Sequence, residues 1–173
     1  MKQQISFYTF ILLLATMLSG CLGAGTHGSL KGYRYPTTKQ KLDSAVMFVI
    51  KNNPNIYRDT NNVNYIIDQT NGKNDTVIDN YYNDGKSYLT IKIKTDKGQN
   101  EYTFRYDGGE KDWKTATTAG IFICYAYNEL GKGGNESNGG VDSKTLQYLT
   151  DVFEKELVHK IDTQLNLTHS ETE

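Results

Sequence analysis

Histidine and acidic side chains are the residues through which this chain could hold a metal ion. The three histidines, His27, His159 and His169, are far apart in the sequence. A zinc site requires three or four ligands that converge at defined spacing. Glu156 and His159 lie one helical turn apart but supply only two ligands, and we expect them to form an exposed ion pair. The sequence therefore predicts neither a metal site nor a cofactor.

Cys124 is the side chain that could act as a nucleophile. It lies in the apolar run of residues 121–125, and no histidine is close to it in sequence. A catalytic thiolate needs electropositive, partly open surroundings, so we expect Cys124 to be buried and inert. The chain also contains no HExxH, paired CxxC, GxSxG or Walker pattern. We therefore expect no enzymatic activity.

The aromatic residues are the set that best suggests a binding surface, because 13 residues are tyrosine and one is tryptophan. A ring offers apolar area together with a polar tip, which suits glycan and peptide recognition. The alternative is that tyrosine simply suits a half-hydrated strand surface. The residues that could share a partly exposed sheet face are Tyr82 (or Tyr81), Tyr88, Trp113 and Tyr125 (or Tyr127).

The first 20 residues have the order of a secretory leader. Lys2 supplies positive charge, residues 5–18 are mainly apolar, and Ser19 and Gly20 are small. This order is typical of a signal peptide, and the apolar run is shorter than the roughly 20 residues that a spanning helix needs. An ordinary secretory leader and an uncleaved anchor are the alternatives to a lipoprotein leader.

The quartet Leu18-Ser19-Gly20-Cys21 resembles the lipobox of bacterial lipoproteins. The resemblance implies cleavage before Cys21, a diacylglyceryl group on its sulfur and usually a third acyl chain, such as palmitate, on the new amino terminus. Two or more chains hold a protein firmly on a membrane. Leu22 stands where inner-membrane lipoproteins of enteric bacteria carry aspartate. The resemblance therefore favours the cell outer membrane, on its periplasmic side.

Composition limits the partners and the number of domains. The 19 basic and 20 acidic side chains nearly balance, whereas nucleic-acid binding needs a concentrated basic surface, so we expect no nucleic-acid partner. Without the leader, roughly 150 residues suffice for one domain. We expect a signal peptide over residues 1–20, a flexible tether over 21–29, a single domain over 30–165 and a disordered tail over 166–173.

Apolar residues at helical spacing predict two helices. The first begins at Thr37 as N-cap, with Gln40 completing a capping box, and ends near residues 52–54. The second begins at Asp142 or Ser143. The expected buried stripe of the first helix is Leu42, Ala45, Val46, Val49 and Ile50, and that of the second is Leu146, Leu149, Val152, Phe153, Leu157 and Ile161.

Between the helices the apolar period changes to two, which predicts strands. We expect them at residues 63–67, 76–82, 87–94, 102–106 and 120–127, with a short edge strand at 30–36. Tight turns are expected at 83–85 and 95–98, and a mobile glycine-rich loop at 131–140. The fold class predicted is α+β. An antiparallel sheet of four to five strands carries an N-terminal and a C-terminal helix on one face, as a two-layer sandwich.

These observations lead to two hypotheses about function. The first is a lipid-anchored protein of the cell envelope that acts as a non-enzymatic interaction or accessory domain toward an unknown envelope protein, with an inhibitor or immunity role as a special case. The alternative is a lipoprotein that binds a small ligand or a glycan through the Tyr- and Trp-rich sheet face. In both hypotheses the membrane is contacted through lipidated Cys21.

Overall fold

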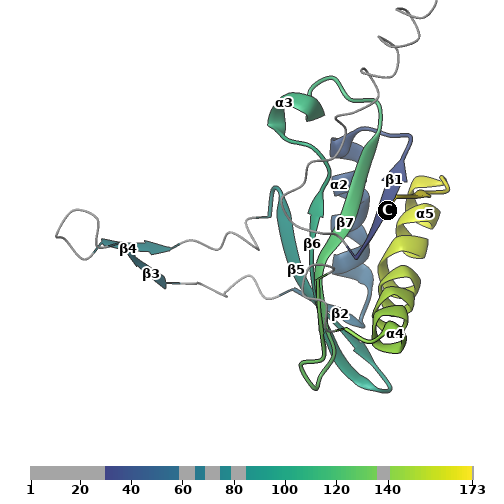
Figure 1. The fold of residues 1–173 in the computed structure, drawn as a ribbon. Helices are drawn as coiled ribbons and strands as arrows, with labels where there is room; N and C mark the ends of the chain where they lie inside the picture. The colour runs from purple at the N-terminus through teal and green to yellow at the C-terminus, as the bar shows by residue number, and fades with distance from the viewer. Residues whose placement is uncertain (1–29, 59–64, 69–74, 79–84, 136–140, 173) are drawn as a thin grey trace, which may run out of the picture.

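The computed structural model describes residues 30–58, 65–68, 75–78, 85–135 and 141–172. An antiparallel sheet packs with one face against a layer of helices (Figure 1). The predicted α+β class, with both helices on the same face, is confirmed. Cys21 and Tyr82 lie outside the described residues. Every helix in the described ranges is too short or too polar to span a bilayer.

The main sheet has seven strands rather than four to five, because four short ones extend it. Its order is β2-β5-β6-β7-β1-β9, and β8 also pairs with β7. The three long strands lie in its centre and supply most of the apolar face. The strands are β1 (Lys31–Tyr35), β2 (Ile56–Tyr57), β5 (Tyr88–Thr95), β6 (Gly98–Tyr106), β7 (Ala119–Tyr127), β8 (Gly133–Gly134) and β9 (Ser170–Thr172).

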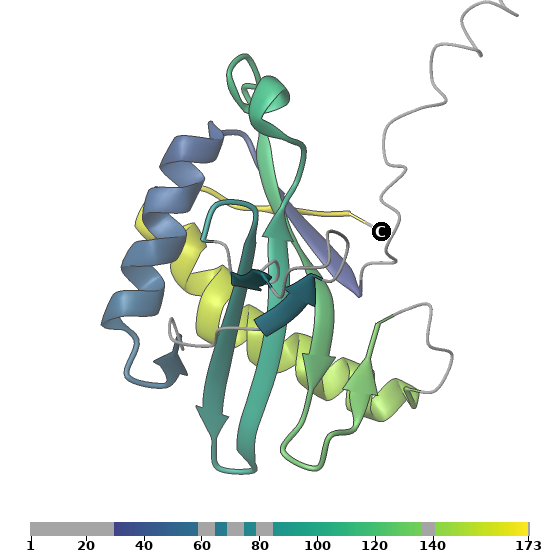
Figure 2. The same ribbon diagram turned by 90° about the vertical axis from the view of Figure 1, so that its left-hand side faces the viewer.

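Two of the predicted strands belong to a separate hairpin. β3 (Tyr65–Asp68) and β4 (Asp75–Ile78) pair with each other and not with the main sheet. They lie on the side of the sheet away from the helices (Figures 1 and 2). The edge of β5 is instead paired with β2, through Ile56 and Ile93. Residues 83 and 84 of the expected turn lie outside the described residues, as do residues 136–140 of the expected loop.

Helix α2 (Lys39–Asn52) covers the sheet with the predicted apolar stripe. Its N-cap is Thr38 rather than Thr37, and the Thr38 Oγ1 accepts a hydrogen bond from the Lys41 N–H at 3.4 Å. The helix ends before Pro54, since the residue preceding a proline avoids the helical region. The five side chains predicted to face the core are all buried: Leu42, Ala45, Val46, Val49 and Ile50.

The C-terminal helix of this layer consists of three consecutive segments. α4 (Ser143–Phe153) begins at the predicted cap, where the Asp142 carboxylate accepts a hydrogen bond from the Thr145 N–H at 3.0 Å. The π-helical turn η3 (Glu154–Val158) then inserts into the helix, and α5 (His159–Leu165) continues it. The π-helical turn adds Val158 to the buried stripe, beside the predicted Leu157 and Ile161.

The chain after the last helix is ordered up to Thr172, which corrects the prediction of a disordered tail over residues 166–173. β9 pairs with the outer edge of β1. The Glu171 carboxylate lies 2.9 Å from the Lys31 ammonium, and the His169 Nδ1 lies 3.0 Å from an Asp162 carboxylate oxygen. The backbone pairing and these two contacts hold this polar segment in place. Because it has no apolar periodicity, its sequence did not predict a strand.

Four tyrosines join the sheet to the helices. Tyr33, Tyr35, Tyr102 and Tyr106 are at most 1% exposed. The Tyr102 hydroxyl donates to the Leu149 carbonyl at 2.9 Å, and the Tyr106 hydroxyl donates to Asp43 at 2.7 Å. Much of the tyrosine content therefore serves the core, where each ring is buried and its hydroxyl finds a partner on a helix.

Candidate functional site

The sheet face opposite the helices, which we call the outer face, carries two cross-strand rows of side chains. Both rows run across β5, β6 and β7. Along each strand, the residues of these rows alternate with residues that point toward the helices. Among the latter, Leu89, Ile91, Phe104 and Ile121 are buried. The first row is Tyr88, Arg105 and Phe122, and the second is Thr90, Thr103 and Tyr125.

Arg105 holds the first row together. Its guanidinium carbon lies 5.1 Å from the centre of the Tyr88 ring and 5.3 Å from that of Phe122. Its Nη1 also donates to the Tyr88 hydroxyl at 3.2 Å. A guanidinium that stacks on two rings loses little freedom when it meets a further partner, so this row is preorganised.

The second row is more polar. The hydroxyl oxygens of Thr90 and Thr103 lie 3.0 Å apart in a hydrogen bond, and both residues are half-buried. Tyr125 is half-buried beside them. The outer face thus combines threonine hydroxyl groups with aromatic rings and a stacked arginine, and the last two are enriched where proteins recognise partners.

The structure brings together two of the four predicted aromatic residues. Tyr88 and Tyr125 both lie on the outer face, in neighbouring rows, but Tyr88 is only 3% exposed whereas Tyr125 is half-buried. Trp113 does not join them: it lies in the short helix α3 (Glu110–Trp113), with the Lys39 ammonium 4.9 Å from its ring. Its indole N–H donates to the Asp107 carbonyl at 2.7 Å. Lys39 begins α2 in the helical layer, so Trp113 lies at one end of the sheet, apart from the two outer-face tyrosines.

Cys124 is buried, as predicted. It is 2% exposed and occupies a β-bulge, where Thr103 pairs with Tyr125 and Phe104 pairs with Ile123. Burial raises the pKa of the Cys124 thiol to about 12, although the nearby Arg105 charge opposes this shift. The thiol is therefore neutral near pH 7, and a neutral thiol is a poor nucleophile.

Glu156 and His159 do not form the expected pair. The Glu156 carboxylate binds the Lys160 ammonium at 2.9 Å, whereas the His159 ring stacks near that of His169, with 6.4 Å between their centres. In the described ranges no three His, Cys, Asp or Glu side chains are grouped closely enough to hold a metal ion. His27 lies outside these ranges.

Glu156 is the centre of a polar network that the sequence did not reveal. It is 7% exposed and accepts hydrogen bonds from the side chains of Asn53 at 3.1 Å and Asn55 at 3.2 Å. Burial raises the pKa of Glu156, but these hydrogen bonds and Lys160 outweigh burial and lower it to about 2. The signal in the sequence is the Asn-Asn-Pro-Asn segment at residues 52–55, which by itself predicts only the end of a helix.

Comparisons of the chain with protein-family models, with curated proteins and with solved structures found no match.

Proposed function

We propose that this protein is a lipid-anchored interaction domain of the bacterial cell envelope, and that a protein partner docks on its outer face. The lipobox-like quartet ending in Cys21 supports the anchor. The row of Tyr88, Arg105 and Phe122 supports the docking surface and is the observation that carries this proposal. The proposed role is accessory and does not involve catalysis.

The arrangement of the two layers suits such a role. The helices bury the apolar side of the sheet, so the core does not depend on the outer face. Side chains of the outer face can therefore serve recognition without disturbing the core. Tyrosine and arginine supply a large share of the binding energy at protein interfaces, because each combines apolar contact area with hydrogen bonding.

The test is photo-crosslinking in cells that carry the full lipoprotein. A photoreactive phenylalanine analogue replaces Phe122 on the outer face, and in a separate strain it replaces Phe48. Phe48 is half exposed on α2, in the opposite layer, and is the matched control. We expect Phe122 to give one dominant cross-linked protein that Phe48 does not give.

A second variant tests the docking surface while the photoreactive residue stays in place. Arg105→Gln removes the stacked charge while Phe122 retains its position, and it should reduce the yield of the cross-linked product. The proposal fails if the Phe122 and Phe48 probes capture the same abundant neighbours. It also fails if the Phe122 product forms equally well with Arg105→Gln.

A further inference from the structure

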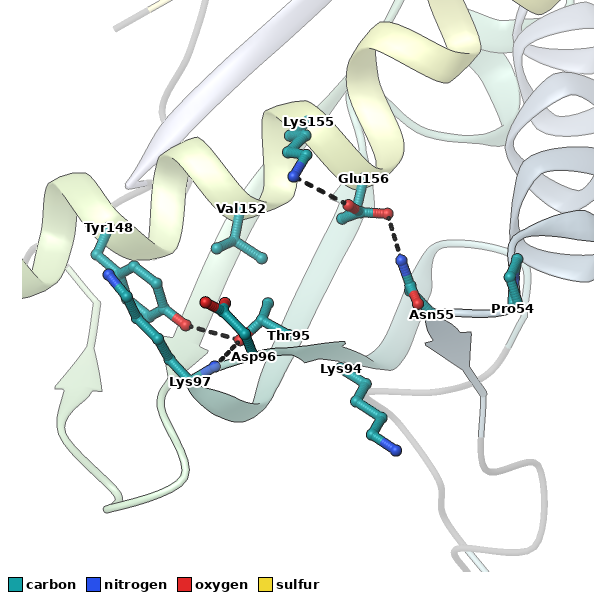
Figure 3. Close-up of a pocket in the computed structure, with 10 residues that line it drawn as sticks. All are labelled: Pro54, Asn55, Lys94, Thr95, Asp96, Lys97, Tyr148, Val152, Lys155 and Glu156. Atoms are coloured by element: carbon teal, nitrogen blue, oxygen red, sulfur yellow. Dashed lines mark hydrogen bonds and ion pairs between the residues drawn. The ribbon is translucent and has the colours of Figure 1, made fainter.

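A cleft of about 760 Å³ lies between the helical layer and the β5–β6 turn (Figure 3). Its volume falls in the range of small-molecule sites. The cleft is bounded by the loop after α2, by the β5–β6 turn, by α4 and by the π-helical turn η3. π-Helical turns are frequent at functional sites. The side chains that matter for its chemistry are Asn55, Asp96, Lys97, Tyr148, Lys155 and Glu156.

One wall of the cleft supplies a cation. Glu156 forms this wall, and its carboxylate is already bound by Asn53, Asn55 and Lys160. The Lys155 ammonium lies 3.9 Å from Glu156, and the Lys155 side chain is 80% exposed. Because Lys160 already compensates Glu156, the charge of Lys155 remains available to an anionic group in the cleft.

A second cation is positioned at the opposite end by Tyr148. The Tyr148 hydroxyl is fixed by Thr95 and Asn100, each at 3.1 Å. The Lys97 ammonium lies 5.1 Å from the centre of the Tyr148 ring. No ion pair among the described residues involves Lys97. A shallower hollow of about 520 Å³ also shares Lys97 and Tyr148, so the depression continues along α4.

Asp96 gives the cleft a hydrogen-bond acceptor. Its carboxylate points up from the β5–β6 turn toward the interior of the cleft, whereas Lys94 points away (Figure 3). Among the described residues, Asp96 takes part in no ion pair. A carboxylate with free oxygen atoms can accept hydrogen bonds from neighbouring hydroxyl groups of a sugar, and the amide of Asn55 lies across the cleft. Lys160 compensates the charge of Glu156, so the remaining charges that face the cleft are those of Lys97, Lys155 and Asp96. Two positive charges against one negative charge favour a ligand with net negative charge over a neutral zwitterion.

We propose that this cleft binds an acidic sugar, of hexose size and bearing one carboxylate or phosphate group. Lys155 binds the acidic group, Lys97 adds positive charge at the other end, and Asp96 accepts hydrogen bonds from the ring hydroxyls. Val152, which projects from the helix between Tyr148 and Glu156 (Figure 3), supplies apolar contact to the sugar ring. This site is separate from the outer face, so either proposal can fail without the other.

The test is calorimetric titration of the full chain in detergent micelles with glucuronate, glucose 6-phosphate, glucose, alanine and inorganic phosphate. We expect saturable binding of one or both acidic sugars, and which of them binds identifies the acidic group. Glucose, alanine and inorganic phosphate should bind at least tenfold more weakly than that sugar. Binding should also weaken with added salt, because the cleft is open to solvent.

Variants locate the site. Lys155→Gln should weaken binding of the acidic sugar by up to about fivefold, as expected for an exposed ion pair, and the double variant Lys97→Gln/Lys155→Gln should weaken it by up to about 25-fold. Lys111→Gln, on α3 at the other end of the sheet, is the matched control and should bind as the wild type does. The proposal is overturned if neither acidic sugar binds. It is equally overturned if a comparison probe binds as tightly, or if Lys111→Gln and the double variant have the same effect.

Discussion

Among the residues that the structure describes, Glu156 is the one acidic side chain that is buried. It is buried in the π-helical turn, and two asparagine side chains and Lys160 hold it as a carboxylate. A buried charge with this many partners links the end of α2 to the π-helical turn. Removing its charge leaves the Lys160 ammonium without its counter-charge and weakens the hydrogen bonds that the two amides donate to this side chain.

The first prediction concerns the pH dependence that follows from Glu156. Its pKa of about 2 in the folded protein lies below the ordinary 4.5. The stabilisation is therefore complete above about pH 5 and is lost as the pH falls toward 2. Glu156→Gln should lower the free energy of unfolding at pH 7 by about 1–3 kcal/mol, with a smaller difference at pH 3. Urea unfolding at both pH values measures this.

Glu101→Gln is the matched control for that measurement. Glu101 is exposed on β6, with one carboxylate oxygen 3.6 Å from the Lys92 ammonium. Its substitution should cost less than about 1 kcal/mol. An equal loss of stability in the two variants at pH 7, or a difference for Glu156→Gln that does not shrink at pH 3, contradicts the role assigned to Glu156.

The second prediction concerns the reactivity of Cys124. Burial and the raised pKa of about 12 keep the thiol protonated and covered. In the full chain with Cys21→Ser, Cys124 is the sole cysteine. A chromogenic disulfide reagent at pH 8 should react with it at least about a hundredfold more slowly in the native protein than in guanidinium chloride. Comparable rates in the two states would show that the thiol is accessible.

At the scale of elements, β9 closes an edge of the sheet. It pairs with Gly32, Tyr33 and Arg34 of β1. Thr172 packs so closely that a Cβ atom on Gly32 would lie within contact distance of its hydroxyl. An uncovered strand edge presents unpaired N–H and C=O groups that can pair with another chain. β9 therefore protects β1 at the point where the chain enters the domain.

The third prediction tests this protection. Deletion of residues 167–173 removes the β9 pairing together with the contacts of Glu171 and His169. The truncated protein should melt several degrees lower and form dimers or larger species through the edge of β1. Differential scanning calorimetry and size-exclusion chromatography measure the two effects. Glu171→Ala, which removes only an exposed ion pair, should leave both nearly unchanged. A truncated chain that remains monomeric and equally stable contradicts the role of β9.

At the scale of the whole molecule, we expect the proposed anchor and the domain to be independent. Cys21 precedes the domain, which begins its first strand at Lys31. Among the residues that the structure describes, the buried core begins at Tyr33, and Leu30 packs against it. Lipidation should therefore determine where the protein is held without affecting how it folds.

The fourth prediction concerns Cys21. Cys21→Ser should abolish incorporation of radiolabelled palmitate, because serine lacks the thiol that accepts the diacylglyceryl group. The protein should then leave the membrane fraction, or remain with its leader uncut, while its melting temperature is unchanged. Cys124→Ala is the matched control and should incorporate palmitate normally. Equal labelling of the Cys21→Ser protein and the wild type rules out the lipoprotein assignment.

Local pattern was enough to predict the two main helices and the three central strands. The buried stripe of α2 matches the prediction residue by residue, and β5 and β6 bury alternate side chains, as the predicted period of two requires. Helical and strand periodicities are properties of consecutive residues, and each directs one set of side chains to the core. The burial of Cys124 could be predicted for the same reason, because it lies within an apolar run.

The tertiary structure alone decided which distant residues meet. The pairing of β2 with β5, the docking of β9 on β1, and the meeting of Asn53 and Asn55 with Glu156 depend on contacts between segments far apart in the chain. The proposed cleft beside Tyr148 arises in the same way, and Trp113 is separated from Tyr88 and Tyr125 because α3 turns toward α2. The sequence by itself thus predicted a leader, and it determined the class of the fold and the faces of its main elements. Which strand edges pair and which side chains form a site was decided by the packing of the layers. Polar residues outside a periodic pattern acquire partners only once the layers are in place.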